Sequence, residues 1–321
     1  MSEIPFSDTK SIIHHYDPEV GIGNAYKFWA DWPQAIKAIL FGWERTLDHP
    51  AQFHYALDFD GTHLNDAINR TTFTMFGELG IKEGHILDAG CGIGGASLLL
   101  AGKYPKVRFT SVTLSEGQIE MARRRALKNG VSNVDYLVAN YLKLPFSNKE
   151  FDGILGIETF CYVPDDKKLE LLKGMHRVLK PKGRLAVFDA YIADKPDNEM
   201  YMSKLHTKVF RGWNLPDPIS TEFNFLKCAG KAGFKIIKNK DVTERILECS
   251  AEIVPRVKFL RRFTPLANIL IYLKKRNVGI PILSNIGLDD KAIFHFADTA
   301  ELQYDMFKSG DTEFRIIVLE K

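Results

Sequence analysis

Cysteine is scarce in this sequence of 321 residues, and it does not occur in the spacings that hold metal ions. The four cysteines lie far apart, with no Cys-x-x-Cys pair and no Cys/His zinc pattern. Residues 1–17 are polar and lack the apolar run of a secretory signal. No apolar run elsewhere reaches the roughly 20 residues of a membrane-spanning helix. These absences predict reduced thiols, no dedicated metal site and a cytoplasmic protein without a membrane span.

A large excess of charge of one sign is also missing. The formal net charge is only +3, whereas nucleic-acid-binding domains concentrate lysine and arginine on a strongly basic face. Internal repeats and low-complexity tracts are absent from the sequence as well. With 45% hydrophobic and 26% charged residues, the composition is typical of a globular protein with a large core. We therefore expect no nucleic-acid partner, and the sequence leaves the oligomeric state open.

The most informative segment that is present reads Ile-Leu-Asp-Ala-Gly-Cys-Gly-Ile-Gly-Gly, at 86–95. An apolar strand ends near Asp88, and a turn containing Gly90, Gly92 and Gly94 leads into a helix. Glycines let the backbone approach a bound nucleoside closely. The segment therefore predicts a nucleoside cofactor, and a glycine turn without a ligand is the alternative.

The glycine spacing also satisfies the G-x-G-x-x-G fingerprint of dinucleotide-binding proteins, so the next strand has to discriminate. A dinucleotide site has an acid about 20 residues further on, but the next strand ends at Thr113-Leu114-Ser115. Asp88 stands where a carboxylate can bind an ammonium group, which nicotinamide cofactors lack. We therefore expect S-adenosylmethionine, contacted by Asp88, Gly90, Gly92 and Gly94.

From residue 81 onward, short β-rich runs alternate with longer helical patterns, which is typical of a parallel sheet covered on both faces. Helices are predicted at 116–129 and 167–179. Seven strands are predicted, at 85–89, 108–112, 134–138, 151–156, 184–188, 235–239 and 313–319. This order resembles the class I S-adenosylmethionine-dependent methyltransferases. The resemblance implies a Rossmann-like α/β fold: a doubly wound, seven-stranded, mostly parallel sheet with an antiparallel final strand and a helical lid.

The same resemblance divides the chain into a core and two additions. It implies a methyltransferase core at 81–241 and a final core strand at 311–321. Residues 1–80, rich in aromatics and helix formers, are expected to form an N-terminal helical lid segment. Residues 242–310 are too long for a plain loop and are expected to form a lid insertion. Both additions would cover the carboxyl ends of the strands, where doubly wound folds bind ligands.

Two further segments resemble cofactor motifs of the cyclopropane-fatty-acid, sterol and related methyltransferases. The first is the Thr-Leu-Ser-x-x-Gln run at 113–118, by which Thr113, Leu114 and Gln118 would approach the ribose or methionine part of the cofactor. Ser115 is equally credible as a helix N-cap with Gln118 as its capping-box partner, and both roles can hold. The second is Asn140-Tyr141, where the family usually has an acid and then an apolar or aromatic residue against the adenine. The amide oxygen of Asn140 can still accept a hydrogen bond from the adenine amino group.

The segment 156–163, Gly-Ile-Glu-Thr-Phe-Cys-Tyr-Val, resembles a stretch of sterol and prenyl-diphosphate C-methyltransferases. By this resemblance Ile157 belongs to the cofactor site. Methylation of an alkene carbon leaves a carbocation, and Glu158 is the candidate base that removes a proton from it. Phe160 and Tyr162 are candidates to stabilise the cation through their ring faces. In the alternative interpretation, Glu158 accepts backbone amides and the aromatics are ordinary core.

Residues 52–67 loosely resemble the pre-core segment of the same group, which implies that Tyr55 faces the cofactor carboxylate or the substrate. The expected function is thus methyl transfer to an alkene carbon of an apolar small molecule. The acceptor expected first is an isoprenoid such as a prenyl diphosphate or sterol-type lipid. Mg²⁺ is expected only for a diphosphate acceptor. One alternative is N- or O-methylation with His54, His63 or His295 as the base. Another is a cofactor-binding protein without turnover.

The stretch 255–276 mixes apolar and basic residues. A solvated helix face is the first interpretation, because charge runs usually form one. A site for a substrate anion and a peripheral contact with a membrane surface are the alternatives.

Overall fold

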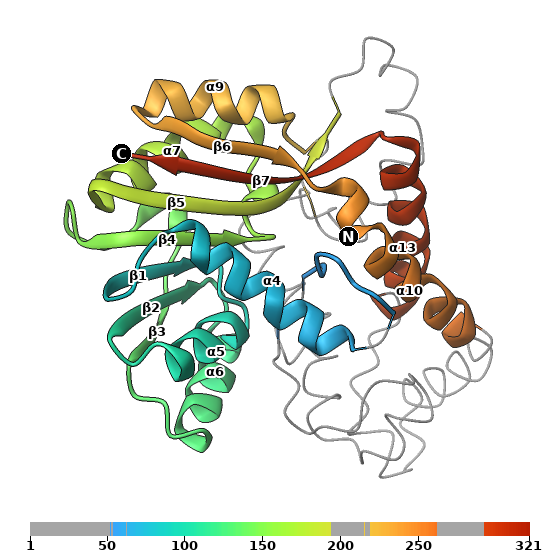
Figure 1. The fold of residues 1–321 in the computed structure, drawn as a ribbon, viewed down its shortest axis with the longest axis horizontal. Helices are drawn as coiled ribbons and strands as arrows, with labels where there is room; N and C mark the ends of the chain where they lie inside the picture. The colour runs from blue at the N-terminus through green and yellow to red at the C-terminus, as the bar shows by residue number, and fades with distance from the viewer. Residues whose placement is uncertain (1–51, 53, 62, 194–214, 216–218, 262–291) are drawn as a thin grey trace, which may run out of the picture.

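The structure is a computed structural model, and it describes residues 52, 54–61, 63–193, 215, 219–261 and 292–321. These residues form one sheet flanked by helices (Figure 1). The strands are β1 (Gly84–Ala89), β2 (Val107–Thr113), β3 (Val134–Val138), β4 (Phe151–Ile157), β5 (Leu179–Ile192), β6 (Lys235–Asp241) and β7 (Thr312–Glu320). The helices are α4 (Leu64–Glu78), α5 (Gly95–Lys103), α6 (Glu116–Lys128), α7 (Lys168–Val178), α9 (Glu222–Ala232), α10 (Thr243–Arg261) and α13 (Ala292–Ser309). Short 3-10 turns are η1 (Tyr141–Lys143), η2 (Phe160–Tyr162) and η3 (Asp165–Lys167).

The sheet is doubly wound. Its seven strands run in the order β3-β2-β1-β4-β5-β7-β6. The pairs β3-β2, β2-β1, β1-β4 and β4-β5 are parallel, whereas β7 is antiparallel to both β5 and β6. This confirms the predicted fold class. The strand order reverses between β1 and β4, so a ligand crevice is expected at the carboxyl ends of these two strands.

The predicted strands are all present, and β3 has the predicted bounds. The largest difference is in β5, which begins at Leu179 rather than residue 184. Leu179 already pairs with Phe151, and the register then shifts before Gly153 pairs with Arg184. The Pro-Lys-Gly sequence at 181–183 follows the end of α7 at Val178 and lies within this irregular part of β5.

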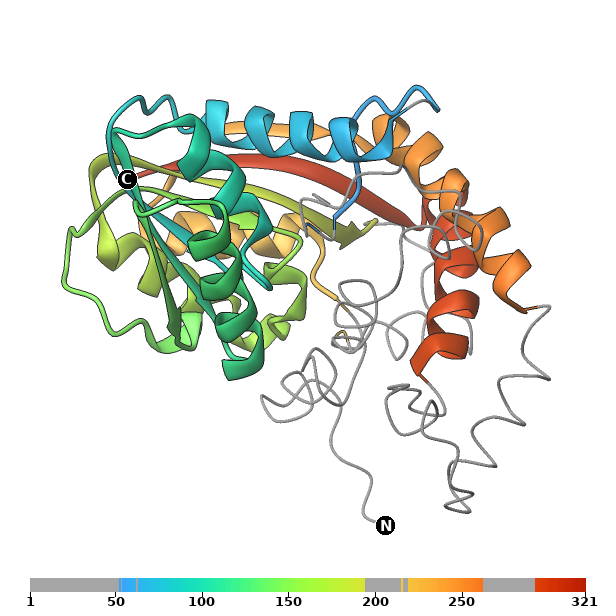
Figure 2. The same ribbon diagram turned by 90° about the horizontal axis from the view of Figure 1, so that it is seen from below.

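Alternation along the strands builds a separate hydrophobic core on each face of the sheet. In β5, Ala186 and Phe188 join the core that α4 and α5 cover. Leu185 and Val187 point the other way, into the core that α7 and α9 cover. Figure 2 shows α4 and α9 on opposite sides of β7. Burial on both faces explains the continuous apolar run at 185–188 of β5, which is an inner strand of the sheet.

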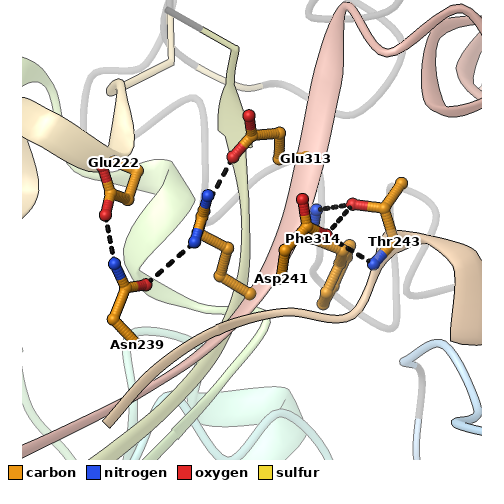
Figure 3. Close-up of polar contacts among 7 residues, drawn as sticks. Glu222, Asn239, Asp241, Thr243, Glu313 and Phe314 are labelled. Atoms are coloured by element: carbon orange, nitrogen blue, oxygen red, sulfur yellow. Dashed lines mark hydrogen bonds and ion pairs between the residues drawn. The ribbon is translucent and has the colours of Figure 1, made fainter.

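Helices α10 and α13 pack against each other beyond the carboxyl ends of the parallel strands (Figures 1 and 2). The start of α10 is tied to β7 through Thr243, whose hydroxyl donates to Asp241 Oδ1 (2.6 Å) and accepts from Phe314 N (2.8 Å; Figure 3). In the part of the chain that the structure describes, no helix has both the length and the apolar character needed to cross a membrane. The predicted lid residues 1–51 and 262–291 lie outside the described residues.

Candidate active site

The turn after β1 has a left-handed backbone at Gly90 (φ 90°), Gly92 (φ 53°) and Gly94 (φ 78°), which glycine adopts without steric cost. A Cβ atom on Gly90 would lie 1.8 Å from Thr159 Oγ1, and one on Gly94 would lie 2.5 Å from the Tyr136 ring. A Cβ on Gly92 would meet nothing within 4 Å. Gly90 and Gly94 thus leave room for the side chains of Thr159 and Tyr136, whereas the space beside the Gly92 Cα is not filled by protein atoms.

Asp88, at the end of β1, has a buried carboxylate oxygen without a protein partner. Its side chain is 4% exposed, and Oδ2 has no hydrogen-bond partner among the described residues. Ser111 is its register partner on β2, and Ser111 Oγ likewise has no such partner. Burial raises the pKa of Asp88 from 3.8 to about 6, and the nearby hydroxyls of Ser97 and Ser111 oppose this shift. A buried polar atom of this kind calls for a ligand or water, and an ammonium group would satisfy a carboxylate.

The turn after β2 confirms the predicted helix cap. Ser115 is the N-cap of α6, and its Oγ accepts from Gln118 N at 3.3 Å. The Gln118 side chain is engaged with Thr113, whose hydroxyl donates to Gln118 Oε1 at 2.7 Å. Leu114, which follows Thr113 in the sequence, is half-buried. The turn therefore has its own internal hydrogen bonds. The cofactor contacts expected of Thr113, Leu114 and Gln118 stay predictions.

Asn140 and Tyr141 follow β3 and lie in the turn that opens η1. Asn140 Oδ1 accepts from Leu142 N at 2.8 Å, which caps the turn. A carbonyl oxygen has two lone pairs, so this bond is compatible with a second donor on Oδ1. The Tyr141 hydroxyl donates to Thr159 O at 3.1 Å. The structure thus links the β3 turn to the turn after β4, while the adenine contacts stay predictions.

Glu158 follows β4 directly and has a strained backbone. Its N donates to Phe188 O at 2.7 Å, which continues the hydrogen bonding between β4 and β5. Its φ is 47°, a left-handed value that costs a non-glycine residue about 1–2 kcal/mol. The half-buried Glu158 carboxylate accepts a 2.5 Å hydrogen bond from Tyr55 N. Strain at a residue with a charged side chain is typical of functional sites.

The surroundings of Glu158 make its carboxylate a stronger base. Burial, and then the nearby charge of Asp189, raise the pKa of Glu158 well above its usual value, and the hydrogen bond from Tyr55 N opposes this shift. A carboxylate with a raised pKa accepts a proton more readily once it is ionised. Glu158 therefore fits the role of general base. It also accepts a backbone amide, from Tyr55 N, which is the structural role considered as the alternative.

Ile157 is half-buried at the last position of β4, next to the crevice expected there. Phe160 is 1% exposed: a Cβ on Gly156 would lie 2.6 Å from its ring, and the Tyr141 ring packs edge-on at 5.8 Å. This placement matches an ordinary core aromatic. Tyr162 is half-buried and packs on a small cluster that includes Met306 of α13. Of the two aromatics, Tyr162 is the one with an exposed side.

Tyr55 reaches the site through its backbone, while its side chain points to α13. The ring packs edge-on against Phe307 (5.6 Å) and Phe314 (5.7 Å), and the hydroxyl donates to Gln303 Oε1 at 2.9 Å. Burial raises the pKa of Tyr55 well above its usual value. The structure therefore brings the peptide N–H of Tyr55 to Glu158. The expected contact of Tyr55 with the cofactor carboxylate or the substrate stays a prediction.

The histidines considered as alternative bases differ in position. His54 has both ring nitrogens within hydrogen-bond distance of protein groups, Nδ1 at 2.9 Å from Tyr55 O and Nε2 at 3.1 Å from Thr72 Oγ1. Burial lowers the pKa of His54 to about 4. His63 is the exposed N-cap residue of α4, and the side chain of His295 lies outside what the structure describes.

The four cysteines are buried free thiols. Within the described ranges, no group of three or more His, Cys, Asp or Glu side chains is placed to hold a metal ion.

Three residues near Glu158 were not anticipated from the sequence: Thr159, Lys168 and Asp189. Thr159 fills the space that Gly90 leaves open. Asp189 and Lys168 contact the turn after Glu158 from β5 and α7. Asp189 follows a predicted strand, which is a usable signal for a site residue. Lys168 stands among charged residues at a helix start, so its sequence context predicts exposure and offers no signal.

The comparisons with known proteins agree with the fold. A family model described as "Methyltransferase domain" matches residues 86–183. Cycloartenol-C-24-methyltransferase 1 of Oryza sativa subsp. japonica is 34% identical over 208 residues, which cover 64% of this chain and 57% of the relative. Methyltransferase GfsG of Streptomyces halstedii is 30% identical over 197 residues, covering 60% and 68% of the two chains. The chain spans a little over half the length of this rice relative and of two further sterol methyltransferases, from Aspergillus fumigatus and Arabidopsis thaliana.

A solved structure extends the similarity over the full chain. Geranyl diphosphate C-methyltransferase from Streptomyces coelicolor A3(2), in complex with Mg²⁺, geranyl diphosphate and S-adenosyl-L-homocysteine, superimposes with a TM-score of 0.63. The sequence identity is 16%, and the match covers 100% of this chain and 99% of that chain. At this identity the similarity shows a shared fold.

Proposed function

Because this chain belongs to the methyltransferase family, we propose that it transfers the methyl group of S-adenosylmethionine to an alkene carbon of an apolar isoprenoid. The rice relative is named a C-24-methyltransferase of cycloartenol, and the Streptomyces coelicolor structure is titled a C-methyltransferase and holds geranyl diphosphate. These names support a carbon acceptor of the prenyl-diphosphate or sterol type.

The residues at the carboxyl ends of β1 to β4 fit the cofactor. The partnerless Oδ2 of Asp88 suits the ammonium of its amino-acid part, and the space above Gly92 allows close approach to the backbone. The remaining residues proposed to hold it are Gly90, Gly94, Thr113, Leu114, Gln118, Asn140, Tyr141 and Ile157. When bound, S-adenosylmethionine supplies an electrophilic methyl group.

The single observation that carries the proposal is the position of Glu158. Its carboxylate lies on a strained turn after β4, next to the glycine turn through Thr159, and its pKa is raised. An alkene that gains a methyl group becomes a carbocation. Glu158 then takes a proton from the adjacent carbon, and the electrons of that C–H bond restore the double bond. The proton stays on the carboxyl group until solvent accepts it.

Helices α10 and α13 are proposed to belong to a lid that shields this cation from water. Their placement beyond the carboxyl ends of the strands supports the assignment. Mg²⁺ is proposed only if the acceptor carries a diphosphate, which the ion would help to bind. The buried free thiols fit the reducing conditions of the cytoplasm, the compartment we propose.

The test is mass spectrometry of reactions that contain methyl-labelled S-adenosylmethionine with prenyl diphosphates, sterols, fatty lipids, phenols or amines. We expect label on a carbon of a prenyl or sterol product. Label only on a phenol oxygen or an amine nitrogen would replace carbon methylation by heteroatom methylation. Cofactor binding without any labelled product would favour a binding protein.

Glu158→Gln tests the role of the base. The variant should lose at least 100-fold in kcat, within the range of general-base contributions, because an amide cannot take the proton. Its cofactor affinity should stay within about threefold, on the ground that an amide oxygen still accepts from Tyr55 N. Glu150→Gln is the matched control, because Glu150 is a half-buried glutamate directly before β4 that likewise accepts a backbone amide, from Ser147 N at 2.8 Å. Full activity of Glu158→Gln would remove Glu158 from the mechanism.

A further inference from the structure

The peptide of Phe160, two residues after Glu158, is held by one buried carboxylate and one buried ammonium group. Asp189 Oδ2 accepts from Phe160 N (2.8 Å) and from Cys161 N (2.9 Å). Lys168 Nζ donates to Phe160 O at 2.5 Å. Asp189, on β5, thus accepts from the N–H groups of Phe160 and Cys161, and Lys168, on α7, donates to the carbonyl oxygen of Phe160.

The burial of these two charges needs an explanation. Lys168 and Asp189 are each 1% exposed, and charged side chains are rarely buried to this degree. Burial lowers the pKa of Lys168 and raises that of Asp189, and each charge opposes the shift of the other. Lys168 is also the first residue of α7, where a positive charge is unfavourable beside the helix dipole. Neither burial nor helix electrostatics accounts for a lysine here.

The turn that these side chains hold is the one that presents Glu158. Phe188 O accepts from Glu158 N, and the next residue, Asp189, accepts from the two amides that follow Thr159. The left-handed φ of Glu158 is stable only if its surroundings fix it. Among these hydrogen bonds, those to Phe188 and Asp189 come from β5, and the one from Lys168 to Phe160 O comes from outside the sheet.

We propose that Lys168 and Asp189 are positioning residues for Glu158, which clamp the Phe160 peptide and so hold the base in its reactive orientation. The inference rests on the proposed function and deepens it. It assigns a task to a lysine whose burial and position at a helix start are both unfavourable. It also makes the geometry of the base depend on α7, a helix on the far side of the sheet from α4.

The test compares Lys168→Met and Asp189→Asn with wild type in the full chain. Three quantities are measured: kcat with the labelled cofactor, the Kd of S-adenosylhomocysteine, and amide hydrogen exchange at 54–56 and 156–163. We expect kcat to fall at least tenfold, Kd to stay within threefold, and the amides of Tyr55, Phe160 and Cys161 to exchange at least tenfold faster. Lys168→Gln keeps a donor without the charge and should recover part of kcat.

Val178→Ala is the matched control, because Val178 is buried on the same helix and lies in the core that α7 covers. It should lower stability without changing kcat or exchange in the turn. An equal loss of kcat in Val178→Ala at equal stability would overturn the proposal, as would full kcat in folded Lys168→Met. If Lys168→Met does not fold, Lys168→Gln is compared with Val178→Ala by the same criteria.

Hydrogen exchange needs no substrate, so the two proposals can fail separately. Wild type that methylates no alkene would end the proposed function. Unchanged exchange at Tyr55, Phe160 and Cys161 in the Lys168 and Asp189 variants would end the proposed clamp, whatever the activity.

Discussion

The backbone amide of Tyr55 donates a 2.5 Å hydrogen bond to the Glu158 carboxylate, although 103 residues separate them in the sequence. The bond joins the segment before α4 to the turn after β4. The Tyr55 ring is held at the same time by Phe307 and Phe314, at the end of α13 and in β7. Because the donor is a peptide group, its position depends on how this whole segment is packed.

Glu158 should give the reaction an ascending pH dependence. A base must be ionised, so kcat should fall as the pH decreases through the pKa of Glu158. Burial and the charge of Asp189 raise that pKa, which places the loss of activity well above the usual carboxyl range near 4.3. The measurement is kcat against pH at saturating cofactor and acceptor. A rate that stays constant down to pH 4.5 would contradict this role.

Asp88→Asn should stabilise the cofactor-free protein and weaken cofactor binding. The folded-state pKa of about 6 exceeds the ordinary value of 3.8, so the neutral form favours folding. This contribution is complete below pH 3.8 and is lost as the pH rises through 6, which makes ionised Asp88 cost at most roughly 3 kcal/mol at neutral pH. Asparagine removes that cost, but it also loses a charge-assisted bond worth about 1.5–3 kcal/mol.

Thermal unfolding with and without S-adenosylhomocysteine measures both effects of Asp88→Asn. Asp135→Asn is the control, since Asp135 is 51% exposed in its ion pair with Arg108 and should change neither quantity by much. A less stable cofactor-free Asp88→Asn protein with unchanged affinity would show that Asp88 is a structural carboxylate.

Gly92→Ala and Gly130→Ala should differ in cofactor binding alone. Both glycines have a left-handed φ, 53° and 65°, and a Cβ on either meets nothing within 4 Å. Each substitution should therefore destabilise the fold by about 1–2 kcal/mol. Only the Gly92 methyl would enter the space proposed for the cofactor, so Kd should rise at least tenfold for Gly92→Ala. Equal affinities in isothermal titration would place the cofactor elsewhere.

Tyr55→Phe should be nearly as active as wild type. The variant keeps the backbone N–H that bonds Glu158 and loses only the hydroxyl bond to Gln303, worth about 1 kcal/mol of stability. We expect kcat and Kd within threefold of wild type. Gln303→Ala removes the same hydrogen bond from α13 and should resemble it. A tenfold rise of cofactor Kd in Tyr55→Phe alone would assign the hydroxyl a direct role in binding.

The sequence by itself determined the features that depend on local physics. Short β-rich runs alternating with helical patterns predicted a parallel sheet covered on both faces, because the inner strands of such a sheet bury side chains on both faces. The family resemblance supplied the doubly wound, seven-stranded order. Glycines at 90, 92 and 94 predicted the turn after β1, and Ser115 predicted the start of α6, because backbone freedom and capping act over a few residues. Glu158 was also predicted, from its position after a strand and a family resemblance.

Only the tertiary structure decided which groups meet. It separated Gly90 and Gly94, which make room for Thr159 and Tyr136, from the open Gly92. It made the Tyr55 peptide the partner of Glu158, and it buried Lys168 in a helix start that reads as exposed. These contacts join distant segments, and their energies depend on burial and exact neighbours. A linear pattern contains neither, because it records which residues are adjacent in the chain and not which are adjacent in space.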